Sequence, residues 1–181
     1  MSNKVKFNIK NVHYAVKTEE GYAAPVAIPG AVAISLEAQG ELTPFYADGI
    51  KYYIASTNSG YEGDLEMALI SDQFRKDVLK EAEDANKVLI ENADIEPVEF
   101  ALGFDIDGDK GVTKFWFFDC TATRPGAKSQ TNEGSKTPIT DTITISAAPD
   151  ADGNVRAKTT ADTSDDILAN WYKAVYTKAT A

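Results

Sequence analysis

Cysteine and histidine are almost missing from this chain, which has one of each among its 181 residues. A single cysteine, Cys120, cannot form an intramolecular disulfide, and this is typical of a protein made in a reducing cytosol. Apolar residues never run for the ~18 residues or more that a membrane-spanning helix requires. The basic N-terminus is not followed by the apolar stretch of a secretory signal. We therefore expect no disulfide, no membrane span and no secretory signal.

Positive charge is also in short supply. Lysine and arginine together number 18, against 28 aspartate and glutamate residues, so the formal net charge is −10. Proteins that bind nucleic acid owe most of their affinity to the neutralisation of phosphates by basic residues. The composition therefore argues against a DNA-binding protein, and solubility is the simplest explanation of the excess of acid.

Signatures of catalysis and of metal binding are missing as well. Residues 105–111 begin like a calcium-binding EF-hand loop, but Lys110 stands where that loop needs glycine and Trp116 where it needs glutamate. We interpret the segment as a hairpin turn. The spacing of His13 and Cys120 does not exclude a nucleophilic pair, because such pairs form in space rather than in sequence, but Cys120 lies in an apolar strand pattern, where a buried thiol is inert. The sequence predicts no enzyme, no cofactor and no metal, and favours a structural or binding role.

Alternation of apolar and polar residues, the pattern of a half-buried β-strand, dominates what is present. Residues 5–9 and 12–16 alternate in opposite phases, so we expect a bulge near Asn11 that moves the apolar face of the strand. Further strands are expected at 32–36, 65–69, 98–106, 112–123 and 139–147, with a short last strand around Val155. The fold class is therefore mainly β, within the α+β class, and the length indicates a single domain over residues 1–181.

Two helices are expected. The first begins at Asp72 with Ser71 as its N-cap, and its apolar residues Phe74, Val78 and Ala82 would share one face. The second begins after Thr163 at an approximate capping box, and its apolar residues follow helical spacing: Ile167, Leu168, Trp171, Tyr172 and Val175. We expect this C-terminal helix to pack on a sheet or on a neighbouring subunit.

The hydrophobic centre of the sequence is a hairpin that turns at Asp107-Gly108. Its second strand contains four consecutive aromatic residues, 115–118, which point alternately to both faces of the sheet. A strand with aromatic residues in both phases is buried on both faces, whereas a single sandwich leaves one face of each sheet in water. We therefore expect a helix or another subunit to cover the surplus face.

Two segments indicate contacts with other proteins. Residues 40–68 combine glycine and small residues with five aromatic residues: Phe45, Tyr46, Tyr52, Tyr53 and Tyr61. Outside a core, such a segment is typical of protein–protein contacts, although a hairpin with a partly buried aromatic cluster would have the same composition. A polar loop over residues 128–137 is long enough to reach a neighbour.

Short motifs spread over nearly the whole chain are similar to the major tail protein family of long-tailed phages of Gram-positive bacteria. In chain order they are Lys4-Val5-Lys6-Phe7, Asn11-Val12-His13-Tyr14-Ala15, Pro29-Gly30-Ala31, Leu42-Thr43-Pro44-Phe45-Tyr46-Ala47-Asp48, Gly63-Asp64-Leu65-Glu66, Phe74-Arg75, Cys120-Thr121-Ala122-Thr123-Arg124-Pro125, Thr142-Ile143-Thr144-Ile145 and Trp171-Tyr172. None of them is a catalytic fingerprint. Their order and spacing together carry the resemblance.

The resemblance implies a β-sandwich of the tail tube type with one flanking helix, a C-terminal helix and long inter-subunit loops. We expect no appended immunoglobulin-like domain, which some members of that family carry at the C-terminus. It implies hexameric rings that stack into the tail tube, through which genome DNA passes into the host without specific binding. Expected partners are further copies of the chain, the tape measure protein, the tail terminator and the tail-tip initiator proteins. The protein would belong to the virion and be assembled in the host cytoplasm. The alternative is a receptor- or carbohydrate-binding β-sandwich module of a phage or cell surface.

Two sets of residues are candidates for the two functional surfaces of such a protein, the contacts between subunits and the wall of the lumen. For contacts between subunits we predict Thr43, Pro44, Phe45, Tyr46, Ala47, Asp48, Tyr52, Tyr53, Tyr61, Arg124 and Pro125. For the wall of the lumen we predict Thr142, Thr144 and Ser146, whose shared strand face is polar, uncharged and flat. On the wall as a whole we expect acidic residues to outnumber basic ones, because an acidic wall would not retain DNA.

Overall fold

The computed structural model describes residues 2–131, 134 and 136–179. In these residues it has thirteen β-strands and two short α-helices, in agreement with the expected mainly β fold class. The polar loop expected over residues 128–137 includes 132, 133 and 135, which lie outside the described residues. The strands are β1 (Lys6–Thr18), β2 (Gly21–Tyr22), β3 (Val26–Ala27), β4 (Ala31–Gln39), β5 (Leu42–Ala47), β6 (Ile50–Ser56), β7 (Gly60–Met67), β8 (Ala82–Glu83), β9 (Leu89–Ile90), β10 (Phe100–Gly108), β11 (Val112–Ala122), β12 (Asp141–Ala147) and β13 (Arg156–Lys158), and the helices are α1 (Asp72–Asp77) and α2 (Asp165–Asn170).

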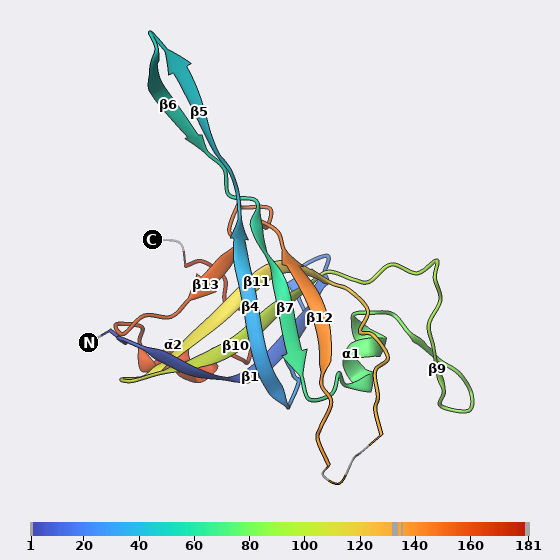
Figure 1. Ribbon diagram of the computed structural model, residues 1–181. Coiled ribbons are helices and arrows are strands. Elements are labelled where there is room, and N and C mark those ends of the chain that lie inside the picture. The colour runs from blue at the N-terminus through green and yellow to red at the C-terminus, as the bar shows by residue number, and fades with distance from the viewer. Residues whose placement is uncertain (1, 132–133, 135, 180–181) are drawn as a thin grey trace.

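One antiparallel sheet of nine strands forms the body of the molecule. Its order is β2-β1-β10-β11-β12-β7-β4, with β13 beside β11 and β3 beside β1. The sheet folds over, so that β12, β7 and β4 cross in front of β1, β10 and β11 as a second layer (Figure 1). Apolar side chains of both layers meet between them, as Tyr61 of β7 does with Phe117 of β11 at 5.2 Å between ring centroids. The result is the expected β-sandwich.

The main core lies between the two layers, and α1 closes one end of it. Tyr14 and Phe100 come from one layer and Leu65 and Ile143 from the other, and all four side chains are fully buried. Phe74 of α1 packs edge-on against Tyr14 and Phe100, at 5.1 and 5.6 Å between ring centroids. Cys120 is fully buried in this core, as expected, and burial raises the pKa of its thiol, which disfavours the reactive thiolate.

The local features of the strands agree closely with those expected from the sequence. Asn11 takes a left-handed conformation with φ of 53°, and the register of β1 against β10 shifts between Lys10 and His13, so the expected bulge is present. The turn between β10 and β11 comes slightly later than expected. The last strand pair is Asp107 with Val112, and residues 109–111 lie in the turn, which is closed by a hydrogen bond from the Gly108 amide to the Gly111 carbonyl.

Both helices begin where the sequence predicted, but they end earlier than predicted. The Ser71 hydroxyl accepts a hydrogen bond from the Phe74 amide at 3.2 Å, which confirms the N-cap of α1. The helix stops at Asp77, and Lys80 has a left-handed φ of 59°, so the prediction that Ala82 lies on the same helical face was wrong. Ala82 instead begins β8.

The C-terminal helix α2 is also shorter than the apolar pattern indicated, because it ends at Asn170 and none of its residues is buried. Trp171, Tyr172 and Val175, which were expected on the helix, lie beyond its end. We call residues 171–176 the C-terminal strap. The Trp171 and Val175 side chains of this strap are buried, and they form a second apolar cluster with Trp116 and Phe118 on the outer face of the sheet.

The strap corrects the expectation about the surplus aromatic face. Phe117 points into the main core, whereas Trp116 and Phe118 point outward, so β11 is indeed buried on both faces. The cover over Trp116 and Phe118 comes from the strap of the same chain rather than from a helix. A second subunit is therefore not needed to bury the aromatic residues of β11.

A buried polar network anchors the strap. The Trp116 indole donates to the Trp171 carbonyl at 3.0 Å, and the Tyr172 hydroxyl donates to the Asp105 carboxylate at 2.5 Å. Asp105 is almost fully buried and also accepts a hydrogen bond from the side-chain amide of Asn11. The pKa of Tyr172 is raised mainly by burial and, to a smaller extent, by the neighbouring Asp105 carboxylate. The His13 ring stacks on Tyr172 at 4.0 Å, so the lone histidine packs against the strap.

Candidate functional site

The aromatic residues of segment 40–68 stand on a hairpin that projects from the body. β5 and β6 form a two-stranded sheet of their own, and Figure 1 shows it extending beyond the sandwich in line with β4 and β7. Asp48 and Gly49 both have positive φ, at 51° and 74°. This is the geometry of the Asp-Gly turns that match the twist of a tight hairpin. We call residues 41–57 the projecting hairpin.

The base of the projecting hairpin is joined tightly to the sheet. The Ser59 amide donates to the Gln39 carbonyl at 2.8 Å, and the Thr57 amide donates to the Glu41 carbonyl at 3.0 Å. A side chain on Gly40 would place its Cβ 2.2 Å from the Thr57 carbonyl oxygen, so the close crossing of the two strands requires glycine there. The hairpin thus continues the β4–β7 ladder as an arm outside the core.

The side chains of the projecting hairpin face solvent. Phe45, Tyr46, Tyr52 and Tyr53 are 60 to 69% exposed. The interpretation of this segment as a partly buried aromatic cluster is therefore wrong. An isolated two-stranded hairpin is marginally stable in water, and contiguous exposed apolar side chains mark interaction sites. Of the predicted contact residues, the hairpin brings together Thr43, Pro44, Phe45, Tyr46, Ala47, Asp48, Tyr52 and Tyr53.

Three predicted contact residues lie elsewhere. Tyr61 belongs to β7, where its half-buried ring packs edge-on against Phe117. The Arg156 guanidinium lies over the same ring, 5.1 Å from its centroid. The Arg124 guanidinium donates to the Ile95 carbonyl at 2.7 Å, and Pro125 beside it is half-buried. Tyr61 and Arg124 therefore make their contacts in this structure within their own chain.

Arg124 binds to a segment that was not recognised as a candidate functional surface from the sequence. We call residues 82–98, which include β8 and β9, the acidic arm, because they contain five carboxylates and one lysine. Figure 1 shows this arm extending from the body beside α1. It is attached through Arg124, which also pairs with Glu91 at 3.1 Å, and through a bond from the Val98 amide to the Val78 carbonyl. The concentration of carboxylates in this segment is the feature of the sequence that could have identified the arm.

The three residues predicted for the lumen wall share the outer face of β12. Thr142, Thr144 and Ser146 are opposite Glu66, Asp64 and Glu62 of β7, respectively. The Thr144 hydroxyl donates to Asp64 at 2.8 Å. Strands β4, β7 and β12 contain no lysine or arginine. The polar residues of β12 thus belong to a larger surface, which we call the acidic sheet face: Glu37, Glu62, Asp64, Glu66, Thr142, Thr144 and Ser146.

The acidic sheet face contains a repulsive pair. Glu37 of β4 lies directly opposite Glu62 of β7, and like charges in that position destabilise a sheet. We predict that Glu37→Gln raises the free energy of unfolding by about 0.2–1 kcal/mol. Urea denaturation at low salt measures this gain, with Glu19→Gln at an exposed turn as the control. High salt should reduce the gain, because it screens exposed charges. Equal stability of wild type and Glu37→Gln at low salt would contradict the repulsion.

Chemical sites are not evident among the residues described. In that part of the chain, no group of three or more histidine, cysteine, aspartate or glutamate residues is placed to hold a metal ion. No helix among the described residues has the length and apolar character needed to cross a membrane. The features that stand out are therefore surfaces: the projecting hairpin, the acidic arm and the acidic sheet face.

Comparisons with known proteins reveal a similarity of fold but none of sequence. No protein-family model and no curated protein sequence matches the chain. A chain in the cryo-EM structure of the anti-feeding prophage baseplate, 6-fold symmetrised, is similar with a TM-score of 0.51 and 11% identity, over 90% of this chain and 99% of that one. At such low identity the likeness concerns the fold alone. The chain therefore shares its fold with a component of that baseplate, and the similarity does not single out the long-tailed phages of Gram-positive bacteria.

Two further structures are similar at lower scores. One is the sheath-tube complex of an extracellular contractile injection system in the extended state, with a TM-score of 0.47 and 10% identity over 83% of this chain and 89% of that one. The other is the tube terminating cap of the anti-feeding prophage, with a TM-score of 0.47 and 12% identity over 87% of this chain and 94% of that one.

Proposed function

We propose that this chain is a structural protein of a phage tail or a related particle, and that its copies form hexameric rings that stack into a tube. The observation that carries the proposal is the projecting hairpin, a solvent-exposed aromatic arm on a fold shared with a baseplate component. Aromatic residues in such positions dominate the energy of protein–protein interfaces. The hairpin would contact the adjacent ring or the neighbouring subunit.

The edge of the sheet supports assembly within a ring. Among the described residues, β4 pairs with β7 on one side only, and it is a nine-residue strand without proline or lysine. Strands of that kind are templates for pairing with another chain. Joining the sheets of six copies through such edges would enclose a central lumen.

The acidic sheet face suits the wall of that lumen. DNA carries about one negative charge per 1.7 Å of its axis, so an acidic wall does not bind it. Screening limits the repulsion to about 8 Å at physiological salt, which makes the wall a non-adhesive lining rather than a long-range guide. Genome DNA would then pass through without specific binding.

The remaining features of the proposal follow from this role. The chain would be a component of the virion without enzymatic activity, assembled in the host cytoplasm, with the tape measure protein, the tail terminator and the tail-tip initiator proteins as partners. The resemblance of its motifs favours a long-tailed phage of Gram-positive bacteria. A receptor- or carbohydrate-binding module is the second candidate, because exposed tyrosines such as Tyr52 and Tyr53 also suit sugar binding.

Electron microscopy and light scattering of the purified protein separate the two candidates. We expect a monomer or loose oligomer when dilute, and hexameric rings or tubes when the protein is concentrated or seeded with tail-initiator proteins. A strict monomer at millimolar concentration that forms no tubes after seeding would favour the binding module. In a structure of the tube, an excess of lysine and arginine on the lumen wall would refute the acidic lining, even if the tube itself formed.

A further inference from the structure

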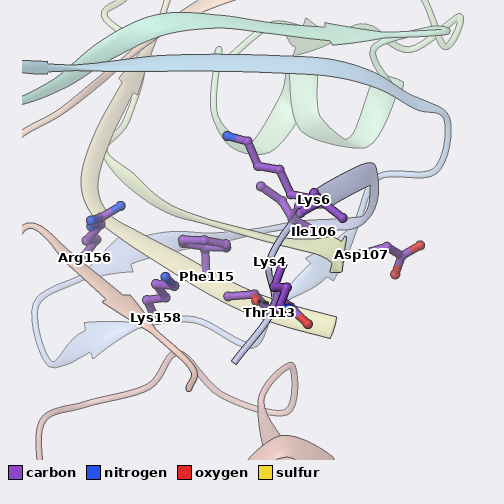
Figure 2. A pocket seen from close by; sticks show the side chains of 10 residues that line it. Lys4, Lys6, Ile106, Asp107, Thr113, Phe115, Arg156 and Lys158 are labelled. Carbon is purple, nitrogen blue, oxygen red and sulfur yellow. Dashed lines mark hydrogen bonds between the residues drawn. The ribbon is translucent and has the colours of Figure 1, made fainter. Parts of the chain in front are cut away.

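A basic recess opens at one end of the sandwich. It has a volume of about 480 Å³ and lies where the N-terminal end of β1 meets β10, β11 and β13. Figure 2 shows four cationic side chains arranged around the ring of Phe115: Lys4, Lys6, Arg156 and Lys158. Ile106 adds to the apolar lining. The recess thus combines an aromatic floor with a rim of positive charge.

The charge of the recess is not neutralised from within the chain. Among the described residues, none of the four cations forms an ion pair with a carboxylate, although the chain has 28 of them. Asp107 borders the recess but is paired with Lys10 at 2.5 Å. Lys158 lies 5.9 Å from the centroid of the Phe115 ring. A concentration of unpaired cations in a protein of net charge −10 is an anion-binding surface.

The acidic arm has the complementary chemistry. Asp94 and Glu96 are exposed and form no ion pair among the described residues, whereas Glu83 and Glu91 are already paired with cations of their own chain. The arm also exposes three apolar side chains that could meet the aromatic floor: Val88 at 53%, Ile90 at 51% and Ile95 at 37%. The arm therefore carries negative charge to match the cationic rim and apolar side chains to match the aromatic floor.

The positions of the two surfaces favour contact between different copies. Figure 1 shows the acidic arm on one side of the body, and the N-terminal end of β1 and β13 on the other. Surfaces that are complementary to each other, but lie on different sides of a molecule, generate head-to-tail contacts, which close into rings when the rotation between copies permits. The projecting hairpin fits the recess less well, because its charged residues are only Glu41, Asp48 and Lys51, which leave a net charge of −1. The acidic sheet face is flat and cannot enter a recess.

We propose that the acidic arm of one copy docks in the basic recess of the next copy, with Asp94 and Glu96 facing Lys6 and Lys158. This inference rests on the proposed function and names a contact between neighbours within a ring. Apolar residues of the arm would pack over Phe115, and the carboxylates would neutralise the rim. Arg124 would act as the positioning residue that holds the arm in place through the Ile95 carbonyl.

Charge reversal on each side tests the contact. The recess variant is Lys6→Glu with Lys158→Glu, and the arm variant is Asp94→Lys with Glu96→Lys; all four positions are exposed, so folding should be unaffected. The matched control, Lys80→Glu with Lys173→Glu, reverses two exposed lysines outside the recess. Sedimentation velocity and negative-stain microscopy measure assembly, and thermal melting verifies the fold. We expect each variant alone to associate about tenfold more weakly or worse, because like charges would face each other.

Mixing provides the decisive result. In an equimolar mixture the two variants can alternate around an even-numbered ring with opposite charges at every contact, so we expect rings to return. Assembly of both variants at the wild-type level would overturn the proposed contact while leaving the proposed function intact. If the recess variant alone fails and mixing does not rescue it, another acidic partner occupies the recess, and the proposal is equally overturned. A wild-type protein that never assembles would instead refute the proposed function.

Discussion

Replacing Phe45 and Tyr46 by alanine will leave the monomer folded and abolish tube growth. Both side chains are about 60% exposed on the projecting hairpin and touch neither apolar cluster, so the core does not lose packing when they are removed. At an interface, aromatic residues of this kind contribute ~2 kcal/mol or more each when truncated. Electron microscopy after seeding measures tube growth, and thermal melting measures the fold.

Two further variants sharpen this test. Leu69→Ala removes a side chain that is 68% exposed outside the hairpin, and it should leave tube growth unchanged. Replacing residues 42–56 by a two-residue turn removes both strands of the hairpin, and the hydrogen bond between Ser59 and Gln39 should still close the β4–β7 ladder. Loss of the cooperative melting transition in the Phe45→Ala, Tyr46→Ala variant would place those rings in the monomer core and refute their assembly role.

Replacing Trp171 by alanine will lower the free energy of unfolding by about 3–5 kcal/mol, the cost of truncating a buried tryptophan. Trp171 is only 4% exposed, and it covers the outward face of β11 together with Val175. Its removal would open a cavity against Trp116 and expose the second apolar cluster to water. Urea denaturation, followed by tryptophan fluorescence and circular dichroism, measures the loss.

The helix next to the strap supplies the matched control. Ile167 is 39% exposed and α2 buries none of its residues, so Ile167→Ala should change stability by no more than about 0.5 kcal/mol. If Trp171→Ala does not fold, Tyr172→Phe offers a milder test, because it leaves the buried Asp105 carboxylate without one hydrogen bond and should cost about 1–3 kcal/mol. Near-wild-type stability of both strap variants would mean that the strap is not an integral part of the domain.

The sequence by itself determined the local features of this protein. Alternation indicated the strands of both layers, the change of phase at Asn11 marked the bulge, and Ser71 marked the start of α1. The Asp48-Gly49 turn was not predicted, although it has the same local origin, because both residues readily adopt positive φ. These features depend on interactions between residues that are close in the chain, so the pattern of residue types was sufficient to predict them.

Only the tertiary structure decided which surfaces are covered and which are left open. Helical spacing extended the C-terminal helix through Trp171 and Tyr172, but packing on Trp116 and the bond to Asp105 hold those residues in the strap instead. Tyr61 and Tyr53 look alike in the sequence, yet one packs on Phe117 and the other faces solvent. The basic recess joins residues from three segments that are far apart in the chain: 3–6, 106–115 and 156–158. Burial and charge clustering depend on contacts between distant residues, so alternation and spacing along the chain could not reveal them.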